Sequence, residues 1–157
     1  MSAKSCAAAA AMLVLLEPAS ASVAQKPALS STAADHLALH VADMQASISF
    51  YRDLFGFAEI PAPGPAARWL DLGGGMALHL IGGRTLAVTP VKSVHLALTT
   101  RDLTPVLGVL RRRQIRWSDW TGETDYAVNI RADGVRQIFF QDPDGYWLEV
   151  NDALGRR

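Results

Sequence analysis

The sequence has a single cysteine and no excess of either charge. Cys6 stands alone among 157 residues, which excludes an intrachain disulfide and a cluster of cysteine metal ligands. Fifteen Lys and Arg residues balance fifteen Asp and Glu residues, so the formal net charge is zero. This balance gives no electrostatic basis for binding nucleic acid or an anionic membrane surface. A metal ion would therefore need His, Asp or Glu as its ligands.

The apolar content is high enough for a folded domain. Hydrophobic residues make up 50% of the chain and charged residues 19%. This composition is too apolar and too weakly charged for a disordered protein. The length suits one domain, or two small modules that share a core.

The N-terminal segment predicts export. Lys4 precedes the apolar run 6–16, and small residues follow it, which is the layout of a secretory signal peptide. The run is too short to span a bilayer comfortably. We expect residues 1–24 to be a signal peptide, residues 25–34 a flexible leader, and the mature protein to be periplasmic and free of the membrane. The alternatives are a buried Ala-rich helix and an uncleaved membrane anchor.

The remaining chain contains an internal repeat. Residues 36–39 and 95–98 both read HLAL, and the same offset aligns Asp43 with Asp102. Residues 75–80 align with residues 145–150 at an offset that is eleven residues longer. We interpret the match as a duplicated unit with an insertion in the second copy, within 117–129. The predicted domain spans 35–151, with modules 35–83 and 92–151 and a tail at 152–157.

Each module is predicted to contain a strand, a helix and three further strands. Residues 35–41 alternate in polarity as a strand does, and Asp43 and Asp102 are suitable N-caps for the helices that follow. Gly56 is expected to end the first helix. The other strands are predicted at 67–72, 76–81, 115–118, 136–141 and 146–150. The fold class is thus α+β, with two βαβββ modules whose helices cover one side of the sheets.

Strand alternation predicts a shared histidine face. Leu37 and Leu39 should face the helices, which sends His36 and His40 to the opposite side. The same parity places the other two histidines, His79 and His95, on that side, together with Glu149. The repeat pairs His36 with His95 and His79 with Glu149. If the modules pack about a pseudo-twofold axis, three imidazoles and one carboxylate converge into a site for a divalent first-row metal.

Four further residues on this face are candidates for a substrate pocket. His40 lies one strand pitch from His36, about 13 Å at roughly 3.3 Å per residue, and is expected at the rim. Trp69, Phe139 and Trp147 share the parity of the histidines and would line an apolar pocket. The alternative is that His40 is an ordinary polar residue of the sheet and that the aromatic residues fill the core or a dimer interface.

The segment DHLALHVADMQASISFYRDLFGF, which begins at Asp35, resembles the opening module of the vicinal-oxygen-chelate superfamily. FFQDPDGYWLEVND, which begins at Phe139, resembles its closing strand-turn-strand. This group includes glyoxalase I, bleomycin-binding proteins and extradiol dioxygenases. The resemblance implies a glyoxalase-like, cup-shaped sheet around one divalent metal (Zn, Ni, Mn or Fe), with ligand positions at His36, His79, His95 and Glu149. It also implies a homodimer, because some members build the cup from modules of two chains.

The function implied by this resemblance is isomerase or lyase chemistry on a small molecule with vicinal oxygens, with Glu149 as the catalytic residue that moves a proton. His79 stands where glyoxalase I carries a glutamate, which leaves Glu149 as the only carboxylate of the set. An extradiol-type Fe(II) dioxygenase that uses His36, His95 and Glu149 is one alternative. A metal-free protein that sequesters a small aromatic compound is another.

Overall fold

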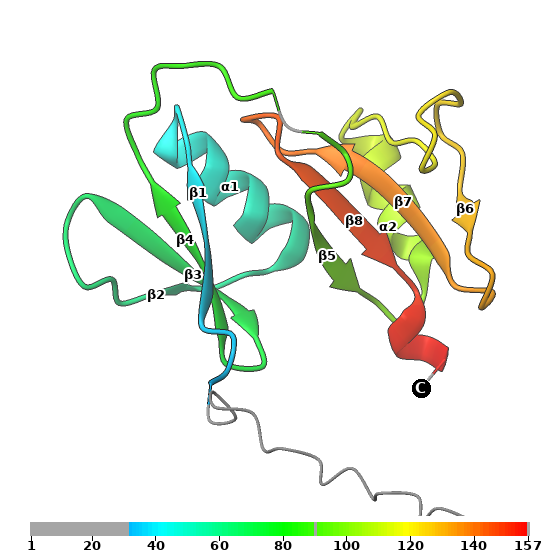
Figure 1. Ribbon diagram of the computed structural model, residues 1–157, viewed down its shortest axis with the longest axis horizontal. Coiled ribbons are helices and arrows are strands. Elements are labelled where there is room, and N and C mark those ends of the chain that lie inside the picture. Colours follow the sequence, from blue (N-terminus) through cyan, green and yellow to red (C-terminus); the bar gives the residue numbers. More distant parts are fainter. Residues whose placement is uncertain (1–31, 90, 157) are drawn as a thin grey trace, which may run out of the picture. The chain divides into compact units, whose positions relative to one another are not determined.

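Two four-stranded sheets, one from each half of the domain, form the frame of the fold (Figure 1). The computed structural model describes residues 32–89 and 91–156, and Ala34–Arg157 forms one compact unit. The first sheet has the order β1-β4-β3-β2 and contains β1 (His36–His40), β2 (Glu59–Ile60), β3 (Ala67–Gly73) and β4 (Met76–Ile81). The second has the order β5-β8-β7-β6 and contains β5 (His95–Thr99), β6 (Asn129–Ile130), β7 (Arg136–Gln141) and β8 (Trp147–Asn151). The expected signal peptide and most of the leader lie outside the described residues.

The two modules have the same topology. β1 pairs with β4 in parallel, and β5 pairs with β8 in parallel, while the remaining pairs in each sheet are antiparallel. This common pattern confirms the predicted duplication and the βαβββ order.

Both helices begin where the sequence predicts. The carboxylate of Asp43 accepts from the Ala46 N–H at the start of α1 (Met44–Phe55). Asp102 likewise accepts from the Thr104 N–H at the start of α2 (Leu103–Arg112). Gly56 ends α1 with φ of 74°, a left-handed conformation that glycine adopts without steric cost. Within the described residues, no helix is long and apolar enough to cross a membrane.

The strand predicted at 115–118 is absent, which is a correction to the sequence analysis. Ser118 forms only isolated bridges, with Asp125 and with Phe139. Trp117 is buried and packs edge-on against Tyr126. The apolar character of the segment thus reflects the anchoring of a connection, whereas the edge strand of this sheet is β6.

The position of β6 locates the insertion. β5 follows β1 by 59 positions, whereas β6 follows β2 by 70. The eleven additional residues therefore lie between Arg112 and Asn129. This inserted segment, residues 113–128, has no full counterpart in the first module.

One hydrophobic core joins the modules. Its buried members include Leu39, Leu78 and Leu80 from the first sheet and Leu148 and Val150 from the second. Residues of both helices belong to the same cluster. This core agrees with the parity assigned from the sequence: Leu39 is buried, and Leu37, Leu96 and Leu98 are partly buried and pack against the cluster.

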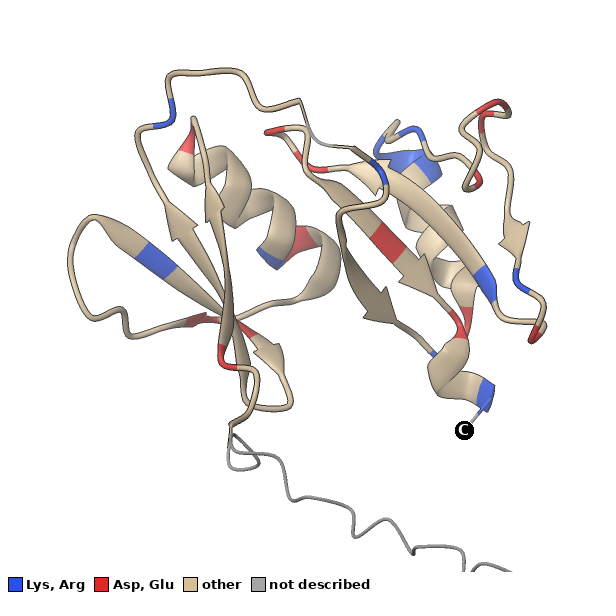
Figure 2. Ribbon diagram, in the orientation of Figure 1, with Lys and Arg blue, Asp and Glu red and all other residues tan. Residues whose placement is uncertain are grey.

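The strands that carry the candidate ligands hold little charge. β1, β4 and β5 contain no Asp, Glu, Lys or Arg, and Glu149 is the only such residue in β8 (Figure 2). The histidine-bearing face is therefore nearly neutral, and the carboxylate of Glu149 is its one formal charge on these strands.

The turn at 142–145 fastens the second module to the first. The Tyr51 hydroxyl on α1 donates to Asp142 over 2.7 Å. Asp144 accepts from the Ala42 N–H (2.8 Å), the Ser47 hydroxyl (2.9 Å) and the Arg84 guanidinium (2.6 Å). The hydrogen bond between Tyr51 and Asp142 is buried, and this burial raises the pKa of both side chains.

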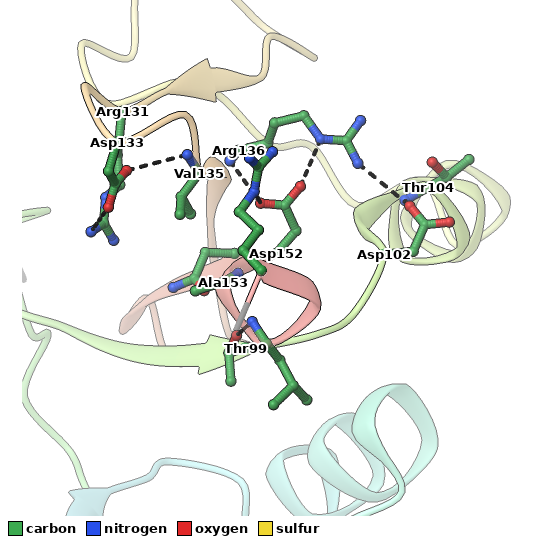
Figure 3. A network of polar contacts seen from close by, with 12 residues as sticks. Thr99, Asp102, Thr104, Arg131, Asp133, Val135, Arg136, Asp152 and Ala153 are labelled. Carbon is green, nitrogen blue, oxygen red and sulfur yellow. Dashed lines mark hydrogen bonds and ion pairs between the residues drawn. The ribbon is translucent and has the colours of Figure 1, made fainter.

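A second carboxylate cluster secures the C-terminal end. Asp152 accepts from the backbone N–H and the guanidinium of Arg136, and Arg136 also reaches Asp102 (Figure 3). Arg156, in the short 3-10 helix Ala153–Arg156, donates to the same carboxylate. Burial tends to raise the pKa of Asp152, but the hydrogen bonds from the two arginines outweigh it and lower the pKa to about 2.

The Tyr51→Phe substitution tests the link between the modules. It keeps the buried ring but removes the O–H donor to Asp142, so the free energy of unfolding at pH 7 should fall by about 1–3 kcal/mol. Chemical denaturation measures this free energy of unfolding. Tyr126→Phe is the control, because the side chain of Tyr126 is 49% exposed, and it should leave stability unchanged. Equal stability of the Tyr51 variant and the native chain would refute the role of this hydroxyl.

The Asp152→Asn substitution tests the C-terminal cluster through pH. Asp152 has a pKa of about 2 in the folded chain, compared with the ordinary value of 3.8 for an aspartate in the unfolded chain. As the pH falls from about 4 toward 2, the unfolded chain therefore takes up a proton at this residue before the folded chain does. The stabilisation from Asp152 is therefore complete above about pH 4 and declines as the pH falls toward 2. Unfolding free energies measured across this range should show the native chain losing its advantage over the variant. The exposed Glu123→Gln should show no such convergence, and a gap that is constant with pH would contradict the prediction.

Candidate functional site

The structure places the four predicted metal ligands in two pairs, one on each sheet. The rings of His36 and His79 have centroids 5.5 Å apart, which we name the histidine pair. His95 Nε2 lies 3.2 Å from Glu149 Oε2, which we name the histidine–glutamate pair. Among residues 32–89 and 91–156, no three His, Cys, Asp or Glu side chains gather into a group that could hold a metal. In one chain the candidate ligands thus form two separate pairs.

The strand register explains why each pair forms. Ala38 on β1 is opposite His79 on β4, so His36 lies on the same face as His79, two residues away. In the second sheet Ala97 on β5 is opposite Glu149 on β8, which sets His95 in the same relation to Glu149. The pairing of positions by the internal repeat is therefore reproduced by the backbone.

The two repeat-related histidines present the same ring nitrogen. His95 Nδ1 is 2.7 Å from the Lys92 carbonyl oxygen, which can only accept, so Nδ1 carries the proton. His36 Nδ1 is 2.6 Å from Asp35 Oδ2 and donates in the same way. In both cases Nε2 is left for another partner. An imidazole fixed through Nδ1 by an oxygen acceptor is the usual arrangement of a metal-binding histidine.

The histidine–glutamate pair needs a cation between its two atoms. With the Nδ1 proton on His95 committed to a carbonyl, a neutral ring presents a lone pair at Nε2 to a carboxylate oxygen 3.2 Å away. A proton or a metal ion relieves that repulsion. The other carboxylate oxygen, Oε1, accepts from Asn151 Nδ2 over 2.7 Å, and Glu149 is only 7% exposed. The donor set of imidazole and carboxylate fits a divalent transition metal.

The residues predicted to line a pocket divide between the two pairs. Trp69 lies beside the histidine pair, with its ring 5.0 Å from His36 and 4.9 Å from His79. Its Nε1–H is buried and has no hydrogen-bond partner, a costly arrangement that a bound oxygen atom would relieve. Phe139 lies beside the other pair, 5.4 Å from the His95 ring, and Trp147 is opposite His95 in the register.

His40 belongs to neither pair. It lies at the far end of β1 from His36, opposite Ile81, and is exposed. Its backbone carbonyl accepts from the Tyr146 hydroxyl over 3.0 Å. The described contact of this residue thus involves the closing turn of the second module rather than either pair.

Two residues near the histidine–glutamate pair are missing from the sequence prediction. Lys92 Nζ lies 4.6 Å from the centre of the Trp147 ring, and the Trp120 ring is 6.3 Å from His95. Both belong to connections that the internal repeat does not duplicate, so no pattern could mark them. Lys92 also lines a cleft of about 550 Å³, together with Ser118, Gly122, Phe139 and Trp147.

Comparison with known proteins agrees with this architecture. The sequence model of the Glyoxalase/Bleomycin resistance protein/Dioxygenase superfamily matches residues 33–150. The structure called Oxidase ChaP-H2 is 25% identical with a TM-score of 0.66, covering 77% of this chain and 93% of its own. Oxidase ChaP-H1 is 27% identical with a TM-score of 0.64, covering 76% and 94%. Among curated proteins, none matches this sequence.

A lactoylglutathione lyase from Agrobacterium tumefaciens shares the fold at 20% identity. Its TM-score is 0.57, and the match covers 76% of this chain and 92% of that protein. The predicted glyoxalase-like fold is thereby confirmed, and the family match extends over most of the sequence. The chain belongs to the Glyoxalase/Bleomycin resistance protein/Dioxygenase superfamily.

Proposed function

We propose that the protein is a divalent-metal-dependent enzyme whose site combines the histidine pair of one copy with the histidine–glutamate pair of a second. The observation that carries this proposal is the matched preparation of His36 and His95. Each has Nδ1 held by an oxygen acceptor and presents Nε2, that of His95 toward Glu149 Oε2 at 3.2 Å, although no third ligand lies within reach in the described part of one chain. The substrate would be a small molecule with two neighbouring oxygen atoms.

Two ligands are too few for a stable transition-metal site, which usually takes at least three from the protein. A symmetric homodimer supplies the missing pair twice, because each copy offers one half-site of each kind. His36, His79, His95 and Glu149 would then hold each metal ion. Zinc, nickel, manganese and iron all accept imidazole and carboxylate ligands.

Glu149 is the residue proposed to move the proton. When bound, the metal would act as a Lewis acid that stabilises negative charge on a substrate oxygen. Asn151 fixes Oε1 of Glu149, so Oε2 is the atom that can take a proton from substrate carbon and return it. Trp69 Nε1–H could donate to a substrate oxygen from the other half-site. Transfer of a proton between two positions is isomerase or lyase chemistry.

Oxygen chemistry is the second candidate, and a specific finding favours it. The two similar structures at 25% and 27% identity are both named oxidases. His36, His95 and Glu149 supply the two histidines and one carboxylate that non-haem Fe(II) oxygenases use. Elemental analysis separates the candidates, because iron together with dioxygen uptake on a catechol supports this one, and zinc or nickel supports the first.

The shared site predicts complementation between two inactive variants. His36→Ala and His95→Ala homodimers should each lose metal, because every site lacks one imidazole. A heterodimer of the two, co-expressed with different tags, should recover about one metal ion per dimer. One of its sites combines the intact halves, and the other carries both substitutions. Metal content and equilibrium dialysis with Zn²⁺ measure this without knowledge of the substrate.

The control is His40→Ala, which should bind metal as the native chain does, because His40 lies outside both pairs. A heterodimer without metal would show that all four ligands come from one chain and would refute the shared site. Native protein that takes up no metal yet binds small aromatic compounds would refute the enzyme and support a sequestering protein.

We also propose that residues 1–24 direct export to the periplasm. The support is the basic, apolar and small-residue layout of the segment in the sequence. N-terminal sequencing of the protein from a periplasmic extract should give a start close to residue 25. A start at Met1 in the cytoplasmic fraction would contradict this proposal.

A further inference from the structure

Lys92 places a positive charge on the aromatic wall beside the histidine–glutamate pair. It is the only lysine among the described residues, and its side chain is half-buried. Its ammonium lies 4.6 Å from the centre of the Trp147 ring and 5.6 Å from that of Phe139. The Trp147 ring belongs to β8, which carries Glu149, and the Phe139 ring belongs to β7, where Phe139 is opposite Glu149.

This ammonium has no carboxylate partner among the residues that the structure describes. It donates to the Ser118 hydroxyl over 3.0 Å and to the Asp119 carbonyl over 2.9 Å, and both acceptors are neutral. Oδ1 of the Asp119 carboxylate accepts from the Thr121 hydroxyl and the Gly122 N–H. A lysine has three N–H donors, so one remains for a ligand. Burial lowers the pKa of Lys92, and the opposing effect of the nearby Asp119 carboxylate is the smaller of the two.

The cleft around Lys92 suits a flat ligand. Its volume of about 550 Å³ lies within the range of small-molecule sites. Its lining includes Phe139 and Trp147, and also Ser118 and Gly122 of the inserted segment, with Ser118 bridged to Phe139. A Cβ on Gly122 would lie 3.0 Å from Lys92 Nζ, so glycine lets the inserted segment approach the ammonium. Trp120 packs edge-on against Phe139 and extends the aromatic surface.

We propose that this cleft binds a planar aromatic compound with an anionic oxygen, a carboxylate or a phenolate. The negative oxygen accepts from Lys92 Nζ, and the ring lies against Trp147 beside the histidine–glutamate pair. Aromatic rings favour stacked or edge-on contacts with one another, and a charge-assisted hydrogen bond fixes the orientation. The inference rests on the proposed function in taking this ligand as the substrate class. The binding itself requires no metal.

Calorimetric titration of the EDTA-treated full-length protein with three probes tests the proposal. The probes are 2-naphthoate, its neutral isostere 2-naphthamide, and the saturated anion decalin-2-carboxylate. The native chain should bind naphthoate about tenfold more tightly than either of the others, since one probe lacks the charge and the other the flat ring. Omitting the metal keeps this result independent of the complementation experiment, so either proposal can fail alone.

Lys92→Met should abolish the preference for naphthoate over naphthamide and change naphthamide affinity by less than about twofold, because methionine retains the apolar stem. The backbone carbonyl that holds His95 is unaffected by this substitution. Lys92→Arg keeps the charge and should keep most of the preference. Arg116→Met is the matched control: it removes one positive charge from the lining of the same cleft, but Arg116 is already paired with Asp125. It should behave as the native chain does.

Three results would overturn the proposal. Equal affinity of the native chain for naphthoate and naphthamide would exclude a role for the charge. Equal affinity for naphthoate and the saturated acid would exclude the aromatic wall. An equal loss in the Lys92→Met and Arg116→Met variants would show a general effect of net charge. Thermal unfolding of each variant checks the fold, and Lys92→Arg provides the comparison if Lys92→Met is unstable.

Discussion

The docking of one acidic turn onto one helix is the interaction on which the arrangement of the domain depends. Asp142 and Asp144 connect the closing hairpin of the second module to α1 and to Arg84 of the first. Buried carboxylates are stable only when their oxygens are fully hydrogen-bonded, so few geometries satisfy both. The turn therefore fixes how the modules share their core. The opposite face of each sheet, which bears the candidate ligands, is left available for other contacts.

The duplicated modules keep one backbone but have diverged in chemistry. The first presents two imidazoles and an unpaired indole N–H, with a carboxylate orienting His36. The second presents an imidazole and a carboxylate, with a backbone carbonyl orienting His95. The proposed proton transfer at Glu149 would therefore belong to one module only. A site shared between copies would join these unlike halves, and its activity would then depend on association.

The inserted segment makes the second module differ from the first at a place that includes none of the four candidate metal ligands. Residues 113–128 bring Ser118 and Gly122 to Lys92 and line part of its cleft, and the first module has no full counterpart of this segment. The proposed ligand preference would thus be able to change through this connection while the strands that carry the four candidate metal ligands keep their register. Surface connections tolerate such change because their backbone is not part of a ladder.

The sequence by itself determined the modules, the capped helices and the faces of the strands. Strand alternation and the N-caps at Asp43 and Asp102 are local properties, and the HLAL repeat required only comparison of the chain with itself. It could not place the edge strand β6, because the apolar residues of 115–118 anchor a loop around Trp117. Only the tertiary structure decided that the candidate ligands divide into two pairs and that Lys92 lies over Trp147. The packing of modules and loops depends on contacts between residues far apart in the chain, and no local period encodes those contacts.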